Sequence, residues 1–301
     1  MAPRDLRRGG RAPPRRRSRG HGEPPRRRPP PHRRRDEPLI RPPAPHTLYR
    51  TGLLLLTAAT GTIDSVSYLA LDRVFTGNMT GNVLFIGFAL AGVDNIPLLN
   101  NAIALAGFVL GSILGARIVG RGHAPGLPRV SAWLLAAGCV LAALLATAWA
   151  VTTTLGTPGQ LAVTALLAGL MGAQVAAVKP VGNVDITTIV VTSTLANLSR
   201  DSRLAGGRQP TPHAARDRFL AVVAMGVGAT VGAFAIRWTS GPVALGTATA
   251  IFALGTAVLV LGRVAQRRDD ASAVRTAIAE NSFATSPYAA SSSGMLDRTR
   301  A

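Results

Sequence analysis

The sequence contains a single cysteine, Cys139, so one chain can form neither an internal disulfide nor a cysteine metal cluster within its 301 residues. Aromatic residues make up only 5% of the chain, and lysine occurs once. The five histidines lie in terminal or loop segments, and the motifs His-Glu-x-x-His, Gly-x-Ser-x-Gly and Gly-x-x-x-x-Gly-Lys are absent. We therefore expect no bound metal, no cofactor and no enzymatic activity.

Charge is scarce in most of the chain and is concentrated in the first 45 residues. This segment holds 15 of the 33 basic residues and 12 of the 21 prolines, but only four acids. Because like charges repel and proline removes hydrogen-bond donors, residues 1–45 are predicted to be a disordered cytoplasmic tail. The tail either binds anionic lipid headgroups or only fixes the membrane topology. It contains no aromatic residue, which argues against RNA recognition.

Long uncharged apolar runs are the most abundant feature of the sequence. A bilayer core about 30 Å thick is crossed by roughly 17–25 helical residues. Six stretches have this length, and none shows the polar face that a soluble helix bundle needs. They are Thr51–Leu71, Leu98–Ala116, Val130–Val151, Gln160–Val178, Phe219–Ile236 and Val243–Gly262. The predicted fold class is therefore an all-α polytopic membrane protein.

Two further apolar segments, Val74–Val93 and Ile186–Ser199, either cross the membrane, giving eight spans, or enter and leave on one side, giving six. Short cytoplasmic loops carry an excess of lysine and arginine. The tail, loops 117–129 and 200–218 and the segment after residue 262 are all basic. All four can be cytoplasmic only if neither segment crosses. We therefore predict six transmembrane helices, two short broken or re-entrant helices and two cytoplasmic termini, with eight spans as the alternative.

The two halves of the apolar region resemble each other at an offset of about 111–112 residues. Gly61 precedes Thr80-Gly81-Asn82, and Gly172 precedes Thr192-Ser193-Thr194. Because each half has three crossings, an odd number, the second half should be inverted relative to the first. The membrane domain is predicted to cover residues 46–265, with half one at about 51–151 and half two at about 160–262. Residues 266–301 are predicted to be a flexible cytoplasmic tail.

Polar residues in and near the broken segments are candidates for lining a solute pathway. Irregular backbone at membrane depth is tolerated where it is buried in protein or lines a watery cavity, and a helix amino terminus there suits an anion or a polar solute. The alternative is that these residues only cap helices and pack. Lys179 is either a charge partner of Asp64 or a boundary residue reaching the headgroups. The candidates are Asp64, Thr76, Asn78, Thr80, Gly81, Asn82, Gln174, Thr188, Thr192 and Thr194.

Several of these residues also carry a family resemblance. The first half contains Gly61-x-x-Asp64, Val74-Phe75 and Asn78-Met79-Thr80-Gly81-Asn82, and the second half contains Met171-Gly172-x-Gln174 and Thr188-x-x-x-Thr192. Over roughly residues 50–265 the chain resembles the YoaK-like family of bacterial integral membrane proteins, which is defined by a domain of unknown function. The resemblance implies a multi-pass protein of the bacterial inner membrane and brings no substrate with it.

The sequence therefore predicts a small-solute channel or secondary transporter with a midplane site built from broken helices. The alternative is a membrane scaffold that transports nothing and whose Arg-rich tail binds anionic lipids or partners. The expected partners are the lipid bilayer, anionic lipids at the tail, an unidentified small solute and further copies of the chain.

Overall fold

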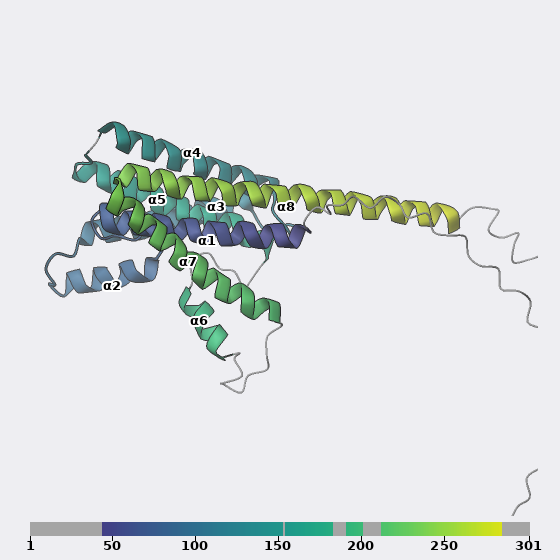
Figure 1. The fold of residues 1–301 in the computed structure, drawn as a ribbon, viewed down its shortest axis with the longest axis horizontal. Helices are drawn as coiled ribbons and strands as arrows, with labels where there is room; N and C mark the ends of the chain where they lie inside the picture. Colours follow the sequence, from purple (N-terminus) through teal and green to yellow (C-terminus); the bar gives the residue numbers. More distant parts are fainter. Residues whose placement is uncertain (1–43, 153, 183–190, 201–211, 285–301) are drawn as a thin grey trace, which may run out of the picture. The chain divides into compact units, whose positions relative to one another are not determined.

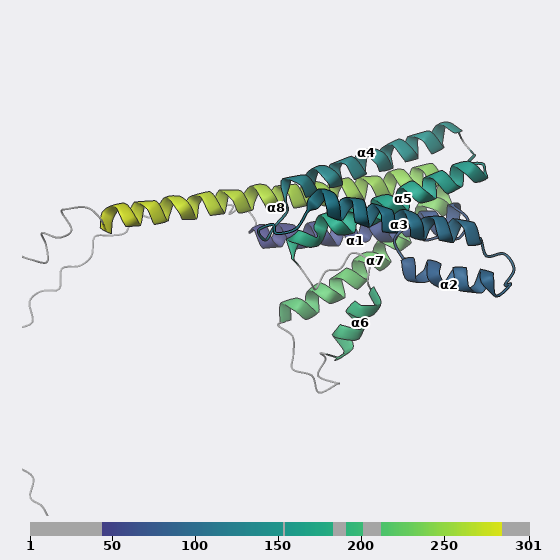
Figure 2. The same cartoon turned by 180° about the vertical axis from the view of Figure 1, so that it is seen from behind.

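The structure is a computed structural model that describes residues 44–152, 154–182, 191–200 and 212–284. The Arg-rich tail lies outside these ranges. Every regular element within them is helical (Figures 1 and 2). The α-helices are α1 (Pro45–Ala70), α2 (Met79–Leu90), α3 (Leu98–Val119), α4 (Arg129–Thr152), α5 (Thr157–Val178), α6 (Val191–Arg200), α7 (Pro212–Trp238) and α8 (Gly241–Ala284), and a 3-10 turn, Lys179–Val181, follows α5.

Six of the described helices, α1, α3, α4, α5, α7 and α8, are long and apolar enough to cross a membrane, and α2 is a shorter apolar helix. The prediction of a polytopic all-α protein with six spans is confirmed, and the eight-span alternative is wrong. The predicted broken segments correspond to α2 and α6, which are 12 and 10 residues long. Both are too short to cross a bilayer core.

The helices extend beyond the apolar runs that predicted them. The largest difference is at the carboxyl end, where α8 continues to Ala284, so residues 266–284 are helical instead of flexible. Neither glycine nor proline occurs between Arg263 and Ala284, and the segment is rich in alanine and arginine, which favour helix. Hydropathy marks where the chain leaves the membrane, and this is not where the helix ends.

Contacts at one end of the helix bundle show which helix ends lie together. The hydroxyl of Tyr49 near the start of α1 donates to Oε1 of Gln266 on α8 at 2.7 Å. The N–H of Leu127, before α4, donates to the same hydroxyl at 3.3 Å. The N–H of Gly126 donates to the carbonyl oxygen of Pro180, after α5, at 3.2 Å. We call this the basic end, because the basic loop 117–129 lies there.

The opposite end of the bundle contains the end of α1 and the start of α3. There, the side-chain amide of Asn100 on α3 donates to Oδ2 of Asp72, which follows α1, at 3.1 Å. The start of α8 also lies there, with Gly241 against the ring of Trp149 near the end of α4. Because α1 ends and α3 begins at the same end, the intervening segment with α2 does not cross. It is re-entrant, as the arginine distribution predicts.

Helix directions show that the second half is inverted relative to the first. The helix α1 begins at the basic end, whereas its counterpart α5 finishes there. An ion pair between Arg50 and Asp217 places the start of α7 at the basic end, where its counterpart α3 finishes. The helix α4 starts at the basic end, and α8 starts at the opposite end. Each membrane-spanning helix of the first half is therefore antiparallel to its equivalent, which confirms the predicted inversion.

Helix crossings reproduce this symmetry residue by residue. Gly61 on α1 lies against the α7 backbone at Met225, and Gly172, 111 positions later, lies against the α3 backbone at Phe108. At both crossings a Cβ atom would overlap a carbonyl oxygen, so only glycine permits the close approach. A second pair of crossings shows the same symmetry. Gly228 on α7 lies against the backbone of Ala58 on α1, and Gly111 on α3 lies against the backbone of Gly169 on α5.

Candidate solute-binding site

Asp64 holds the start of the broken segment against α1. Its side chain is only 5% exposed, although it lies within a span. Oδ1 accepts the N–H groups of Thr76 and Gly77 at 3.0 and 2.6 Å. Asp64 is six residues before the end of α1, so the segment reaches about 9 Å below that end before α2 leads it back. The carboxylate thus satisfies backbone groups that have no helical partner.

Asn82 on α2 fixes the same turn from the other side. Its Nδ2 donates to the carbonyl oxygen of Phe75 at 2.6 Å, and the N–H of Phe75 donates to its Oδ1 at 3.0 Å. The ring of Phe75 stacks on Tyr68 and Phe85, with ring centroids 4.9 and 6.1 Å apart. Asn82 is fully buried, so this pair of hydrogen bonds is shielded from competing water.

Gln174 on α5 connects the second half of the protein to this turn. Its Nε2 donates to Oγ1 of Thr60 on α1 at 3.3 Å, and the Thr60 hydroxyl donates in turn to the carbonyl oxygen of Leu56 at 3.0 Å. Thr60 also lies against Gly77, where a Cβ would be 2.9 Å from Cγ2 of Thr60 and 3.2 Å from both carboxylate oxygens of Asp64. We call this set the central polar cluster: Thr60, Asp64, Thr76, Gly77, Asn82 and Gln174.

Two buried oxygen atoms of the central polar cluster have no donor at hydrogen-bonding distance among the described residues: Oδ2 of Asp64 and Oε1 of Gln174. The backbone N–H of Asn78 also lies near the Asp64 carboxylate, as a weaker interaction than those of Thr76 and Gly77. Buried acceptors are normally paired, because leaving one unsatisfied costs about 1–3 kcal/mol. One oxygen comes from each half of the inverted repeat. The N–H groups of Thr76 and Gly77 are already used by Asp64 and are not free to bind a solute. The remaining capacity of the cluster is to accept hydrogen bonds or to bind a cation.

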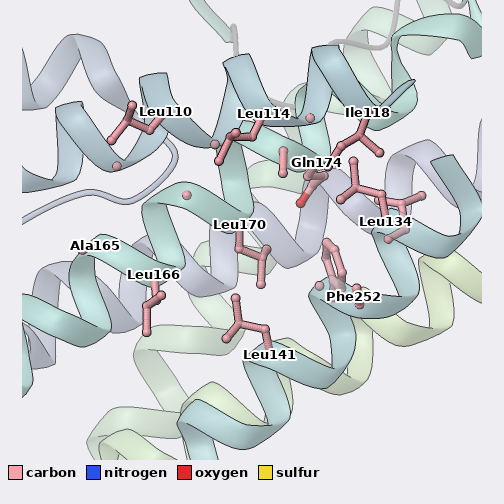
Figure 3. Close-up of a pocket in the computed structure, with 18 residues that line it drawn as sticks. Leu110, Leu114, Ile118, Leu134, Leu141, Ala165, Leu166, Leu170, Gln174 and Phe252 are labelled. Carbon is pink, nitrogen blue, oxygen red and sulfur yellow. The ribbon is translucent and has the colours of Figure 1, made fainter. Parts of the chain in front are cut away.

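An apolar cavity of about 470 Å³ lies beside the cluster, between α3, α4, α5 and α8. Gln174 is the one polar side chain among the residues that line it, and Figure 3 shows its oxygen facing the cavity among leucine side chains and Phe252. Gln174 therefore has two environments. Its amide nitrogen belongs to the central polar cluster, and its oxygen is directed at an apolar space between the spans.

Three other predicted residues of the first broken segment are not in the cluster. Asn78 takes the N-cap position of α2, but its side chain makes no capping hydrogen bond. Thr80 is exposed on α2, and Gly81 packs on the ring of Phe75. The side chains of this polar run therefore do not all face one site. Because α2 is helical, residues 78–82 point in different directions around its axis.

The second broken segment is described only in part. Thr188 lies outside the described residues, and Thr192 lies in α6. Thr194, also in α6, is buried. Lys179 is exposed at the basic end, beside Arg117, and does not reach Asp64. The predicted charge pair is therefore not formed.

Two members of the cluster, Thr60 and Gly77, are absent from the sequence-based prediction. Thr60 precedes Asp64 by one helical turn and so shares its face of α1, which is a signal that the sequence offers. Gly77 follows the predicted Thr76 directly, but nothing in the sequence indicates that its amide binds a carboxylate of α1.

Comparison with known proteins gives a family match over most of this region. A family model described as "Protein of unknown function (DUF1275)" matches residues 52–258. The protein named "UPF0700 transmembrane protein YoaK" from Bacillus subtilis (strain 168) is 33% identical over 194 residues, which are 62% of this chain and 84% of that protein. No solved structure matches the chain.

Proposed function

Because the chain belongs to the DUF1275 family of transmembrane proteins, we propose that it is a small-solute channel or secondary transporter whose solute binds at the central polar cluster. The observation that carries the proposal is the pair of unpartnered oxygens, Oδ2 of Asp64 and Oε1 of Gln174, buried among membrane-spanning helices. Polar groups in such positions are costly and commonly mark solute or ion pathways.

The chemistry of the cluster favours a solute that donates hydrogen bonds or carries positive charge. A carboxylate, an amide oxygen and a hydroxyl are all acceptors or hard-cation ligands. Among the described residues, no cationic side chain forms an ion pair with Asp64. An anion would be repelled by the nearby negative charge of Asp64. We therefore expect a small cation or a neutral amine, amide or alcohol to be transported in preference to an anion.

The described conformation is occluded. Thr60, Thr76 and Asn82 are 0% exposed, and Asp64 and Gln174 are 5% and 2% exposed. Transport therefore requires the broken segment or α5 to move. Inverted repeats commonly provide such motion, because the two halves can exchange conformations around a fixed midplane site. The 3.3 Å bond between Gln174 and Thr60 is a long contact joining the halves, and it is a natural place for them to separate.

Permeability of reconstituted vesicles tests the proposal. Purified protein would be placed in vesicles and exposed to gradients of urea, glycerol, methylammonium chloride or sodium formate, with swelling followed by light scattering. Wild type should admit at least one of the first three faster than protein-free vesicles. Asp64→Asn keeps the shape and one acceptor oxygen, and should slow that flux by on the order of tenfold, as expected for losing one hydrogen bond to a charged group.

Asp72→Asn is the matched control, because Asp72 is exposed at the opposite end of the bundle and lies outside the cluster. It should leave the flux unchanged. If a folded Asp64→Asn protein transports as well as Asp72→Asn, the cluster is not the solute site. If no probe enters faster than in protein-free vesicles, the scaffold alternative is favoured.

A further inference from the structure

A second pocket, of about 770 Å³, lies at the basic end between the end of α3, the loop after it and the end of α5. Four basic side chains line it: Arg117, Arg121, His123 and Lys179. Among the described residues, no acidic side chain lines it. It is separate from the central polar cluster, with which it shares no residue. We call it the basic-end pocket.

The positive charges of the basic-end pocket are not neutralised within the described part of the chain. Arg117, Arg121 and Lys179 are exposed, and none of them forms an ion pair there. His123 is engaged differently, because its Nε2 contacts the carbonyl oxygen of Val119 and ties the loop back to α3. Three cations therefore face one space without a counter-charge, which favours an anionic ligand.

The lining of the pocket changes from apolar to cationic along the helix axes. On α3, Ile113 and Ala116 come before Arg117, and Arg121 lies in the loop just after the helix ends at Val119. Each four-residue step along a helix advances about 6 Å. On α5, Ala176 likewise precedes Lys179. The order from the membrane interior outward is thus apolar and then positive, which is the order of acyl chain and phosphate in a phospholipid.

We propose that the basic-end pocket binds one anionic phospholipid, with the phosphate on Arg117, Arg121 and Lys179 and the acyl chains along Ile113 and Ala116. Guanidinium groups suit phosphate because they donate paired, parallel hydrogen bonds. Basic pockets between membrane helices on the cytoplasmic side bind anionic lipid headgroups, and the excess of arginine assigns the basic end to that side. A free phosphate ion would satisfy the cations but would leave the apolar part of the lining uncovered.

The proposal is tested by native mass spectrometry of the full-length chain in detergent, titrated with phosphatidylglycerol or phosphatidylcholine. Wild type should retain one phosphatidylglycerol more tightly than phosphatidylcholine. Each cation at a membrane surface contributes about fivefold in affinity, so the variant Arg117→Gln/Arg121→Gln/Lys179→Gln should weaken phosphatidylglycerol binding by on the order of 100-fold. The Arg-rich tail is intact in both proteins, so the difference reports the pocket alone.

A triple variant with the same loss of charge controls for non-specific attraction. Arg237, Arg268 and Arg275 are exposed and lie outside the pocket, so Arg237→Gln/Arg268→Gln/Arg275→Gln should bind phosphatidylglycerol like wild type. Equal binding by the two triple variants would overturn the proposal. If the pocket variant is not monodisperse in size-exclusion chromatography, the single changes Arg121→Gln and Lys179→Gln replace it, each with an expected loss of about fivefold.

An added arm separates the lipid from a free phosphate. Millimolar sodium phosphate should not displace phosphatidylglycerol from wild type, because it lacks the apolar contacts. Displacement at that concentration would assign the pocket to the phosphate ion and overturn the lipid proposal. None of these results depends on whether the central polar cluster transports a solute.

Discussion

Oδ1 of Asp64 accepts the backbone N–H of Gly77 at 2.6 Å, thirteen positions further along the chain. This hydrogen bond joins a membrane-spanning helix to the tip of a re-entrant segment. The other carboxylate oxygen, Oδ2, is buried and has no donor at hydrogen-bonding distance in the described part of the chain. One carboxylate oxygen thus anchors the re-entrant segment, and the other is the atom that we propose binds the solute.

Removing the Asp64 carboxylate should destabilise the protein. Asp64→Ala leaves the N–H groups of Thr76 and Gly77 buried without acceptors, at a cost of about 3 kcal/mol in the free energy of unfolding. Asp94→Ala removes an exposed carboxylate that follows α2 and should cost less than about 0.5 kcal/mol. Unfolding titrations in mixed detergent micelles measure both values. Similar losses for the two variants would show that Asp64 is not an anchor of the broken segment.

The two equivalent glycine crossings should respond alike to substitution. In Gly61→Ala and Gly172→Ala the new methyl group overlaps the backbone of α7 or α3, so each change should cost about 1–3 kcal/mol in unfolding free energy. A methyl group at Gly87 on α2 would meet no other atom within 4 Å, so Gly87→Ala should be neutral or stabilise by up to about 1 kcal/mol. Unfolding titrations in mixed detergent micelles measure the unfolding free energy of all three variants. Tolerance of alanine at either crossing would contradict the close approach of the helix backbones.

Substitution of Asn82 should reduce stability far more than substitution of its near neighbour Thr80. Asn82→Asp sets a carboxylate oxygen against the carbonyl oxygen of Phe75, which now receives the Nδ2 donor, and should cost about 2–3 kcal/mol. Thr80 is exposed on α2, so Thr80→Ala should change both stability and flux little. Thermal unfolding and vesicle swelling provide the two readouts. A large loss of flux in Thr80→Ala would place the solute pathway on the other face of α2.

Much of this architecture can be predicted from the sequence, because it depends on the length of the apolar runs, the position of the basic loops and the spacing of glycines. Span length predicts six crossings, and the spacing of basic loops identifies the segments that do not cross. The glycines Gly61 and Gly172 mark equivalent crossings because only glycine allows such close backbones.

The contacts of single side chains were less predictable. Asp64 stands out in the sequence as an intramembrane acid, but whether it would meet Lys179 or the backbone of Gly77 depends on how an irregular loop folds back. No periodicity encodes that path. The helical extension of α8 past Gln266 was missed for a different reason, because hydropathy falls at the membrane surface whether or not the helix stops.

The re-entrant segment returns to the opposite end of the bundle, and thiol accessibility tests this directly. In a Cys139→Ala background, Asp94→Cys follows α2, and Ala124→Cys lies in the loop at the basic end; both positions are exposed. An impermeant thiol reagent applied to intact cells should label the thiol at position 94 but should reach position 124 only after the membrane is opened. Labelling of both positions from the same side would mean that the segment crosses, and the inverted repeat and its midplane site would then be wrong.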